Sequence, residues 1–186
     1  SYADLQERMN RAGNALKGLG LQPEQRVFMC LSDGVDFPAV FFGAMKAGFI
    51  PVPVNSMLTA DDYEYMLGDS RAPVAVVSAP LLDIFEPLIG RLPRLRQIVV
   101  SGDGGGEHGD LGALMAAAEP SLEAAETTAD EVGFWLYSSG STGRPKGAAH
   151  LHGDLVYTVA YYAVGVLGMT ADDVVFSAAK MFFAYG

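Results

Sequence analysis

Short apolar segments alternate with helix-like segments along most of this 186-residue chain, and this alternation limits the folds open to it. Apolar residues at helical spacing mark five segments: Tyr2–Lys17, Phe37–Ala47, Ala60–Leu67, Leu81–Ile89 and Leu111–Ala118. The strand candidates lie between them: Val27–Leu31, Phe49–Val54, Val74–Ser78 and Gln97–Val100. Strands separated by helices form parallel βαβ units. The pattern predicts an α/β fold, with a mainly parallel sheet flanked by helices.

Local signals refine this prediction. Pro51 and Pro53 favour an irregular or edge position for the second strand, because proline cannot donate to a sheet hydrogen bond. Thr59 is a candidate N-cap for the helix that follows it. The Gly-rich stretch Ser101–Gly109 is predicted to be a surface loop, since it lacks the strand-to-helix setting of a phosphate site.

Composition and charge exclude several classes of function. The formal net charge of −10 argues against nucleic acid and anionic membrane surfaces as partners. No apolar stretch reaches the roughly 20 residues that a membrane span needs. The single cysteine, Cys30, lies in a strand candidate and cannot form an internal disulfide. A reducing compartment is therefore favoured, and we expect a cytoplasmic protein.

A Ser/Gly-rich loop carries the strongest chemical signal. It lies between a strand ending near Tyr137 and a predicted helix, Gly153–Leu167. Its members are Ser138, Ser139, Gly140, Ser141, Thr142, Gly143, Arg144, Pro145, Lys146 and Gly147. The glycines allow successive N–H groups to face one concavity, the hydroxyl groups add donors, and Lys146 adds positive charge. This set suits the β- and γ-phosphates of a nucleotide, with Thr142 able to approach Mg²⁺.

The nucleotide-hydrolase P-loop is the main competing motif, and it fails on spacing. Its pattern requires a glycine five residues after the first and a hydroxyl residue after the lysine. Here Pro145 lies five residues after Gly140, and Gly147 follows Lys146. A flexible turn without a ligand is the other alternative, and the particular order of the loop argues against it.

The loop resembles the signature of the acyl-adenylate-forming superfamily, which includes acyl- and aryl-CoA ligases, luciferases and peptide-synthetase adenylation domains. Ser138–Gly147 satisfies each position of that signature, and the likeness extends over nearly the whole chain. The resemblance implies that residues 1–186 form one part of a large N-terminal AMP-binding domain. It also implies a two-step reaction with ATP, Mg²⁺ and coenzyme A. In that reaction Ser139, Ser141 and Thr142 would contact the phosphates, and the variable Arg144 would be solvated. Lys146 would supply charge or, alternatively, stabilise the loop itself.

The C-terminal segment Ser177–Gly186 (SAAKMFFAYG) resembles benzoate-CoA ligases and their hydroxybenzoate relatives. By this resemblance Ala184, Tyr185 and Gly186 would line an aryl pocket, while Phe182 and Phe183 are expected to pack. Family members that activate amino acids generally place an aspartate here, and Lys180–Gly186 contains no acidic residue. A benzoate-like acid is therefore expected, and a fatty acid stays open.

The remaining polar candidates are weaker. His150 and His152 lack the i, i+4 spacing of a helical zinc pair. Asp61, Asp62 and Glu64 suit the N-terminal turn of a helix, where acids favour the helix dipole. Lys180 could contact a carboxylate or be a solvated residue. We also predict a strand over Val174–Ala178.

The resemblance also defines what is missing. Family members carry a later Tyr-Gly-x-Thr-Glu segment, a ribose-binding aspartate and a small C-terminal domain with a catalytic lysine, and none of these occurs by Gly186. We expect an N-terminal fragment of a ligase that does not turn over alone and self-associates through surfaces left exposed. A non-catalytic nucleotide- or phosphate-binding module is the alternative.

Overall fold

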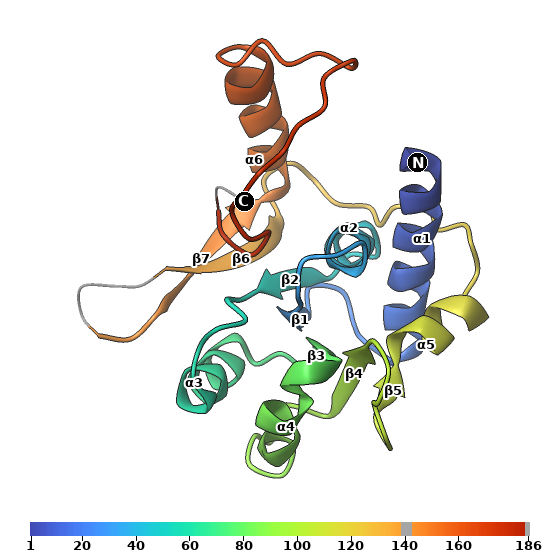
Figure 1. The fold of residues 1–186 in the computed structure, drawn as a ribbon, viewed down its shortest axis with the longest axis vertical. Coiled ribbons are helices and arrows are strands. Elements are labelled where there is room, and N and C mark those ends of the chain that lie inside the picture. The colour runs from blue at the N-terminus through green and yellow to red at the C-terminus, as the bar shows by residue number, and fades with distance from the viewer. Residues whose placement is uncertain (139–142, 185–186) are drawn as a thin grey trace.

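A computed structural model describes residues 1–138 and 143–184 of the chain (Figure 1). Over these residues the strands form a five-stranded parallel sheet of order β2-β1-β3-β4-β5 and a separate antiparallel pair, β6-β7. The sheet contains β1 (Arg26–Cys30), β2 (Ile50–Pro53), β3 (Val74–Ser78), β4 (Gln97–Ser101) and the two-residue β5 (Gly109–Asp110). The predicted α/β fold with a mainly parallel sheet is confirmed, and β5 is the strand that its pattern did not predict.

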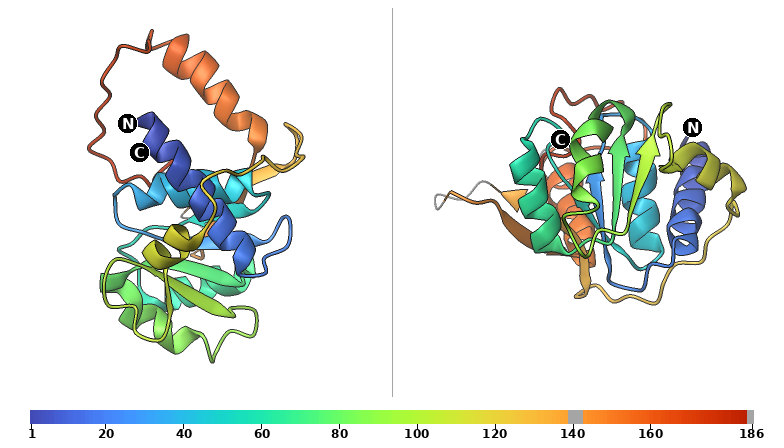
Figure 2. Two further views of the ribbon diagram at one scale, coloured as in Figure 1. Left: turned by 90° about the vertical axis from the view of Figure 1, so that its right-hand side faces the viewer. Right: turned by 90° about the horizontal axis from the view of Figure 1, so that it is seen from below.

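Helices cover both faces of this sheet (Figures 1 and 2). One face carries α1 (Tyr2–Gly18), α2 (Asp36–Lys46) and α5 (Leu111–Ala117). The other carries α3 (Ala60–Ser70) and a short run made of η1 (Ala79–Leu81), α4 (Leu82–Phe85) and η2 (Glu86–Leu88). The predicted helix Leu81–Ile89 is thus broken into short turns, because Pro80 and Pro87 interrupt backbone hydrogen bonding. All residues of β3 are buried, as expected for a strand covered on both faces.

Two local predictions are confirmed by the geometry. β2 pairs only with β1 and so lies at one edge of the parallel sheet. Proline, which has no backbone N–H to donate, is tolerated at such an edge. Thr59 caps α3: its hydroxyl accepts from the Asp62 backbone N–H, and the Asp62 carboxylate accepts from Thr59 in return.

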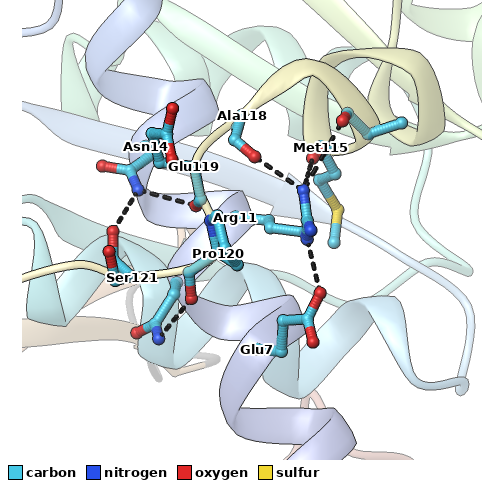
Figure 3. Close-up of polar contacts among 10 residues, drawn as sticks. Glu7, Arg11, Asn14, Met115, Ala118, Glu119, Pro120 and Ser121 are labelled. Atoms are coloured by element: carbon cyan, nitrogen blue, oxygen red, sulfur yellow. Dashed lines mark hydrogen bonds and ion pairs between the residues drawn. The ribbon is translucent and has the colours of Figure 1, made fainter.

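An extended segment, residues 118–131, runs from α5 to β6 and is held by side chains of α1 (Figure 3). Arg11 donates to the carbonyl oxygen of Ala118 at 2.7 Å. Asn14 donates to those of Glu119 and Ser121 at 2.9 and 2.8 Å. These bonds satisfy carbonyl groups that belong to no helix or strand, and they define the path by which the chain reaches β6.

The last part of the chain extends away from the parallel sheet (Figure 2). β6 (Val132–Ser138) and β7 (Lys146–Leu151) form a hairpin, followed by α6 (His152–Tyr157) and the π-helix η3 (Thr158–Val164). Two predictions were wrong here. The phosphate loop joins two antiparallel strands rather than a strand and a helix, since the KGAAHL segment forms β7 by backbone pairing and not by an apolar pattern. Val174–Ala178 forms no strand among the described residues, where Val174 is 98% exposed and has no partner strand.

None of the helices in the described part of the chain is long and apolar enough to cross a membrane.

Candidate functional site

The hairpin holds the two ends of the predicted phosphate loop close together. Ser138 at the end of β6 pairs with Lys146 at the start of β7, and Tyr137 pairs with Gly147. The predicted hydroxyl contacts Ser139, Ser141 and Thr142, together with Gly140, lie outside the described residues. Their phosphate contacts, and the Mg²⁺ contact of Thr142, therefore stay predictions. The described ends show that the chain leaves β6 and enters β7 at paired positions of the hairpin.

The backbone geometry explains why two positions of the loop are glycine. Gly143 has φ = +94°, a left-handed conformation that disfavours other residues. Gly147 lies against two rings: a Cβ added there would be 3.3 Å from Cε3 of Trp135 and 3.4 Å from Cζ of Tyr137. The glycines that the sequence assigned to phosphate binding thus also allow the hairpin to turn and to pack closely.

Helix α3 supports both arms of the hairpin. The hydroxyl group of Tyr137 donates to Oδ2 of Asp69 at 2.6 Å and approaches the carbonyl oxygen of Met66 at 3.2 Å. Burial, and then the Asp69 carboxylate, raise the pKa of Tyr137, so this hydroxyl keeps its proton and remains a donor. On the other arm, the Arg144 guanidinium lies 5.0 Å from the centroid of the Tyr65 ring. Arg144 is exposed, in agreement with its predicted solvated position, and its cation–π contact with Tyr65 was not predicted.

Tyr65 and Asp69 are four residues apart on α3, so they lie on the same face of the helix. That spacing is the sequence signal that could have predicted the contacts between α3 and the hairpin. The loop stems are thereby attached to the parallel sheet through α3, at one side of the molecule.

A small cavity of about 170 Å³ lies beside the loop stems. Ser138 and Pro145 contribute from the hairpin, and Pro53, Val54 and Asn55 contribute from the end of β2. In open α/β sheets, ligands bind outside the carboxyl ends of the strands. The loop therefore lies where this fold class places its ligands.

A larger apolar cavity of about 340 Å³ adjoins it. Its walls come from α2, the hairpin, α6 and the C-terminal segment, and they include Phe41, Phe134 and Ala184. Pro53 and Phe183 line both cavities, so the two spaces are neighbours. Of the predicted acyl-pocket residues, Ala184 faces this apolar cavity, while Tyr185 and Gly186 lie outside the described residues.

Asp33, just after β1, attaches the C-terminal segment to the sheet. Its carboxylate accepts from the backbone N–H of Met181 at 3.1 Å and pairs with Lys180, Nζ to Oδ2, at 3.1 Å. The Met181 hydrogen bond, and then Lys180, lower the pKa of Asp33. Lys180 thus contacts a carboxylate of the protein itself. Phe182 is buried in the core, as the packing prediction required, and Phe183 is partly buried against it.

The two histidines do not form a metal site. The His150 ring stacks on Phe134, with centroids 4.7 Å apart, and its Nδ1 lies 3.4 Å from Oδ2 of Asp154. His152 is the first residue of α6. Across residues 1–138 and 143–184, no three His, Cys, Asp or Glu side chains are grouped so that they could hold a metal ion.

The sequence family follows from comparison with known proteins. A family model described as AMP-binding enzyme matches residues 1–186, the whole chain. This chain belongs to the AMP-binding enzyme family. The family resemblance deduced from the loop is therefore confirmed.

Among curated relatives of this AMP-binding chain, the benzoate–CoA ligase of Thauera aromatica is 54% identical over 187 residues. The 4-hydroxybenzoate–CoA/benzoate–CoA ligase of Rhodopseudomonas palustris is 44% identical over 186 residues. Both alignments cover all of this chain but only 35% and 34% of the relatives. The chain therefore spans about a third of the length of the curated relatives it matches.

Solved structures agree with the computed fold. The anthranilate CoA ligase AuaEII, in complex with anthranoyl-AMP, superposes with a TM-score of 0.93 at 38% identity, over 96% of this chain and 35% of that one. A benzoate CoA ligase from Burkholderia xenovorans LB400 gives a TM-score of 0.88 at 38% identity, over 98% of this chain and 35% of that one. This chain thus shares its fold with two solved CoA ligases that are named after aryl acids.

Proposed function

We propose that this chain is the nucleotide-binding portion of an ATP-dependent aryl-CoA ligase. Its acid–thiol ligase reaction would have two steps. An aryl carboxylate oxygen attacks the α-phosphorus of ATP, which forms an aryl-adenylate and releases pyrophosphate. The sulfur of coenzyme A then attacks the acyl carbon, loses its proton, and displaces AMP to give the thioester. AMP is needed because a carboxylate oxygen is itself a poor leaving group.

One observation carries this proposal: the small cavity beside the stems of the phosphate loop adjoins the apolar cavity, and the two cavities share Pro53 and Phe183 in their walls. An acid whose ring occupied the apolar cavity could direct its carboxylate toward a nucleotide held at the hairpin. Proximity of this kind converts an encounter of two substrates into an oriented reaction. The placement of Ala184 in the apolar wall supports an uncharged acyl group there.

The chain's own residues would bind and orient the substrates. The loop Ser138–Gly147 would surround the β- and γ-phosphates, with backbone N–H and hydroxyl donors and the charge of Lys146. Mg²⁺ would neutralise phosphate charge when bound, and Thr142 is the proposed contact. No described residue of this chain is proposed to transfer a proton.

An aryl acid is favoured over a fatty acid by the curated relatives. Benzoate–CoA ligase of Thauera aromatica is 54% identical, whereas the long-chain-fatty-acid–CoA ligase FadD13 of Mycobacterium tuberculosis is 30% identical over 82% of the chain. The cavity volume of about 340 Å³ is at the low end of small-molecule sites, and it suits a compact ring.

The decisive experiment uses a protein that includes this chain and is as long as its curated relatives. Acid-dependent ATP–pyrophosphate exchange and CoA-thioester formation are measured with benzoate, 4-hydroxybenzoate and a long-chain fatty acid. We expect benzoate or a substituted benzoate to give the highest kcat/KM. A preference for the fatty acid would contradict the aryl assignment, and nucleotide binding without exchange for any acid would support the non-catalytic module.

The 186-residue chain by itself is expected to show no exchange, because it spans about a third of the length of the curated relatives it matches. Benzoate-dependent exchange by the isolated chain would contradict this expectation. The cytoplasmic location inferred from the single cysteine also stays a prediction.

A further inference from the structure

A second basic site lies at the amino-terminal edge of the parallel sheet, opposite the edge that carries the phosphate loop. Arg26 begins β1, Arg71 follows α3, and Arg94 and Arg96 come just before β4. Together with Gln25 and two prolines, these arginines line a cavity of about 330 Å³. We call this group of four arginines the arginine pocket.

The arginine pocket concentrates positive charge in an acidic protein. It holds four of the twelve lysine and arginine residues of a chain whose net charge is −10. Within the described residues, no carboxylate pairs with any of the four guanidinium groups. Arg26 donates to backbone carbonyl oxygens only, of Ser70 at 2.6 Å and of Glu24 at 3.2 Å.

These charges repel one another. Burial, and then the nearby Arg71 and Arg94, hold the pKa of Arg26 below its usual value. Arg71 has a structural explanation, since a positive charge after the last turn of α3 stabilises the helix dipole. Arg94 and Arg96 follow no α-helix and have no such role. Their convergence on Arg26 adds like-charge repulsion that the nearby Glu24 offsets only in part, and an anion bound between them would relieve it.

We infer that the arginine pocket binds a compact phosphate anion with two or more negative charges, of the size of pyrophosphate. Planar guanidinium groups contact phosphate oxygens through paired hydrogen bonds, and arginines from three separate segments can surround a tetrahedral group. The site is concave, which suits a small anion better than the extended surface of a protein partner. This inference is independent of the proposed ligase activity.

Trp135 adjoins the arginine pocket and also packs against Gly147 of the phosphate loop, so the variants below assign its signal to one site or the other. It is the only tryptophan in the sequence, and Arg26 lies 5.7 Å from the centroid of its ring. Pyrophosphate is titrated into the 186-residue chain at low ionic strength, with tryptophan fluorescence and calorimetry as readouts. We expect saturable binding that the double substitution Arg94→Gln/Arg96→Gln weakens by about tenfold for each arginine removed.

Two control variants separate this site from others. Lys17→Gln removes one positive charge at the exposed end of α1, outside the residues that line the arginine pocket, and should leave binding unchanged. Lys146→Gln weakens the phosphate loop and should leave the arginine-dependent binding in place. Thermal unfolding should be similar in all variants, because Arg94 and Arg96 are exposed. Equal pyrophosphate affinity of the double variant and the unmodified chain would overturn the inference, as would tighter binding of hexaglutamate than of pyrophosphate.

Discussion

Cys30 shows how strongly burial changes a single side chain in this protein. It lies at the end of β1 with no exposed surface, and burial raises the pKa of its thiol to about 12. The thiolate is the reactive form, so its fraction at pH 8 is about a thousandfold smaller than for an exposed cysteine of pKa 9.0. We expect Cys30 to resist a disulfide reagent at pH 8 until the protein unfolds. Fast labelling of the folded chain would contradict the buried placement.

The same shift predicts a pH dependence of stability. The pKa of Cys30 is higher in the folded state, so its contribution to the unfolding free energy is complete below the ordinary thiol pKa. The contribution then declines as the pH rises toward 12, because the unfolded thiol ionises first. Urea unfolding at a series of alkaline pH values should show a shallower decline for Cys30→Ala than for the unmodified chain. Parallel declines would contradict the prediction.

At the scale of elements, α1 and α2 approach each other through glycine. A Cβ added to Gly43 would lie 2.5 Å from the Met9 carbonyl oxygen and 2.9 Å from the Gly13 nitrogen. Gly43→Ala must therefore separate the helices, and we expect a loss of roughly 1–3 kcal/mol in unfolding free energy. Gly18→Ala is the matched control, since it makes the same change where no heavy atom lies within 4 Å. It should be neutral or raise stability by up to about 1 kcal/mol. Equal urea midpoints for the two variants would contradict the close approach of α1 and α2 at Gly43.

The attachment of the hairpin to α3 is also a property of elements. Tyr137→Phe removes the hydroxyl that donates to Asp69 and leaves the ring in place. We expect a loss of about 1 kcal/mol in unfolding free energy. Amide hydrogen exchange in β6 and β7 should be faster than in the unmodified chain, while exchange elsewhere changes less. Tyr2→Phe makes the same change at a 91% exposed ring and should alter neither quantity. Unchanged exchange in the Tyr137→Phe hairpin would mean that the bond to α3 does not hold it.

At the scale of the whole molecule, exposed apolar side chains collect on α6, η3 and the segment that follows. The group consists of Val156, Tyr157, Val159, Tyr161, Tyr162, Val164, Val166, Leu167, Val174, Val175 and Phe176, each more than half exposed. Exposed apolar side chains in this number favour association. We predict that copies of the 186-residue chain associate through this group.

Sedimentation velocity over a range of concentrations tests this association. The double substitution Tyr161→Lys/Val166→Lys should convert the associated species to monomer, because charge on this surface opposes its burial. Met57→Lys introduces a lysine at another exposed apolar residue, 68% exposed, and should leave association unchanged. A monomeric unmodified chain at high concentration would contradict the prediction.

The local signals in the sequence were sufficient for four of the five strands of the parallel sheet. The apolar runs of β1, β3 and β4, the prolines of β2 and the Thr59 cap depend on residues close together in the chain, and each was placed correctly. The order of residues in the Ser138–Gly147 loop was likewise sufficient for the family. These features are local because turns, caps and burial periodicity are determined over a few residues.

Tertiary contacts decided the rest. β7 forms because β6 offers it backbone partners, and among the described residues Val174–Ala178 pairs with no strand. The support of the hairpin by Tyr65 and Asp69, the pairing of Lys180 with Asp33, and the convergence of four arginines join residues that lie far apart in the chain. No local pattern specifies such distances. The sequence by itself determined the alternation of helices with the first four strands and the family to which the chain belongs. Only the folded chain decided what holds the loop stems and which charged side chains meet.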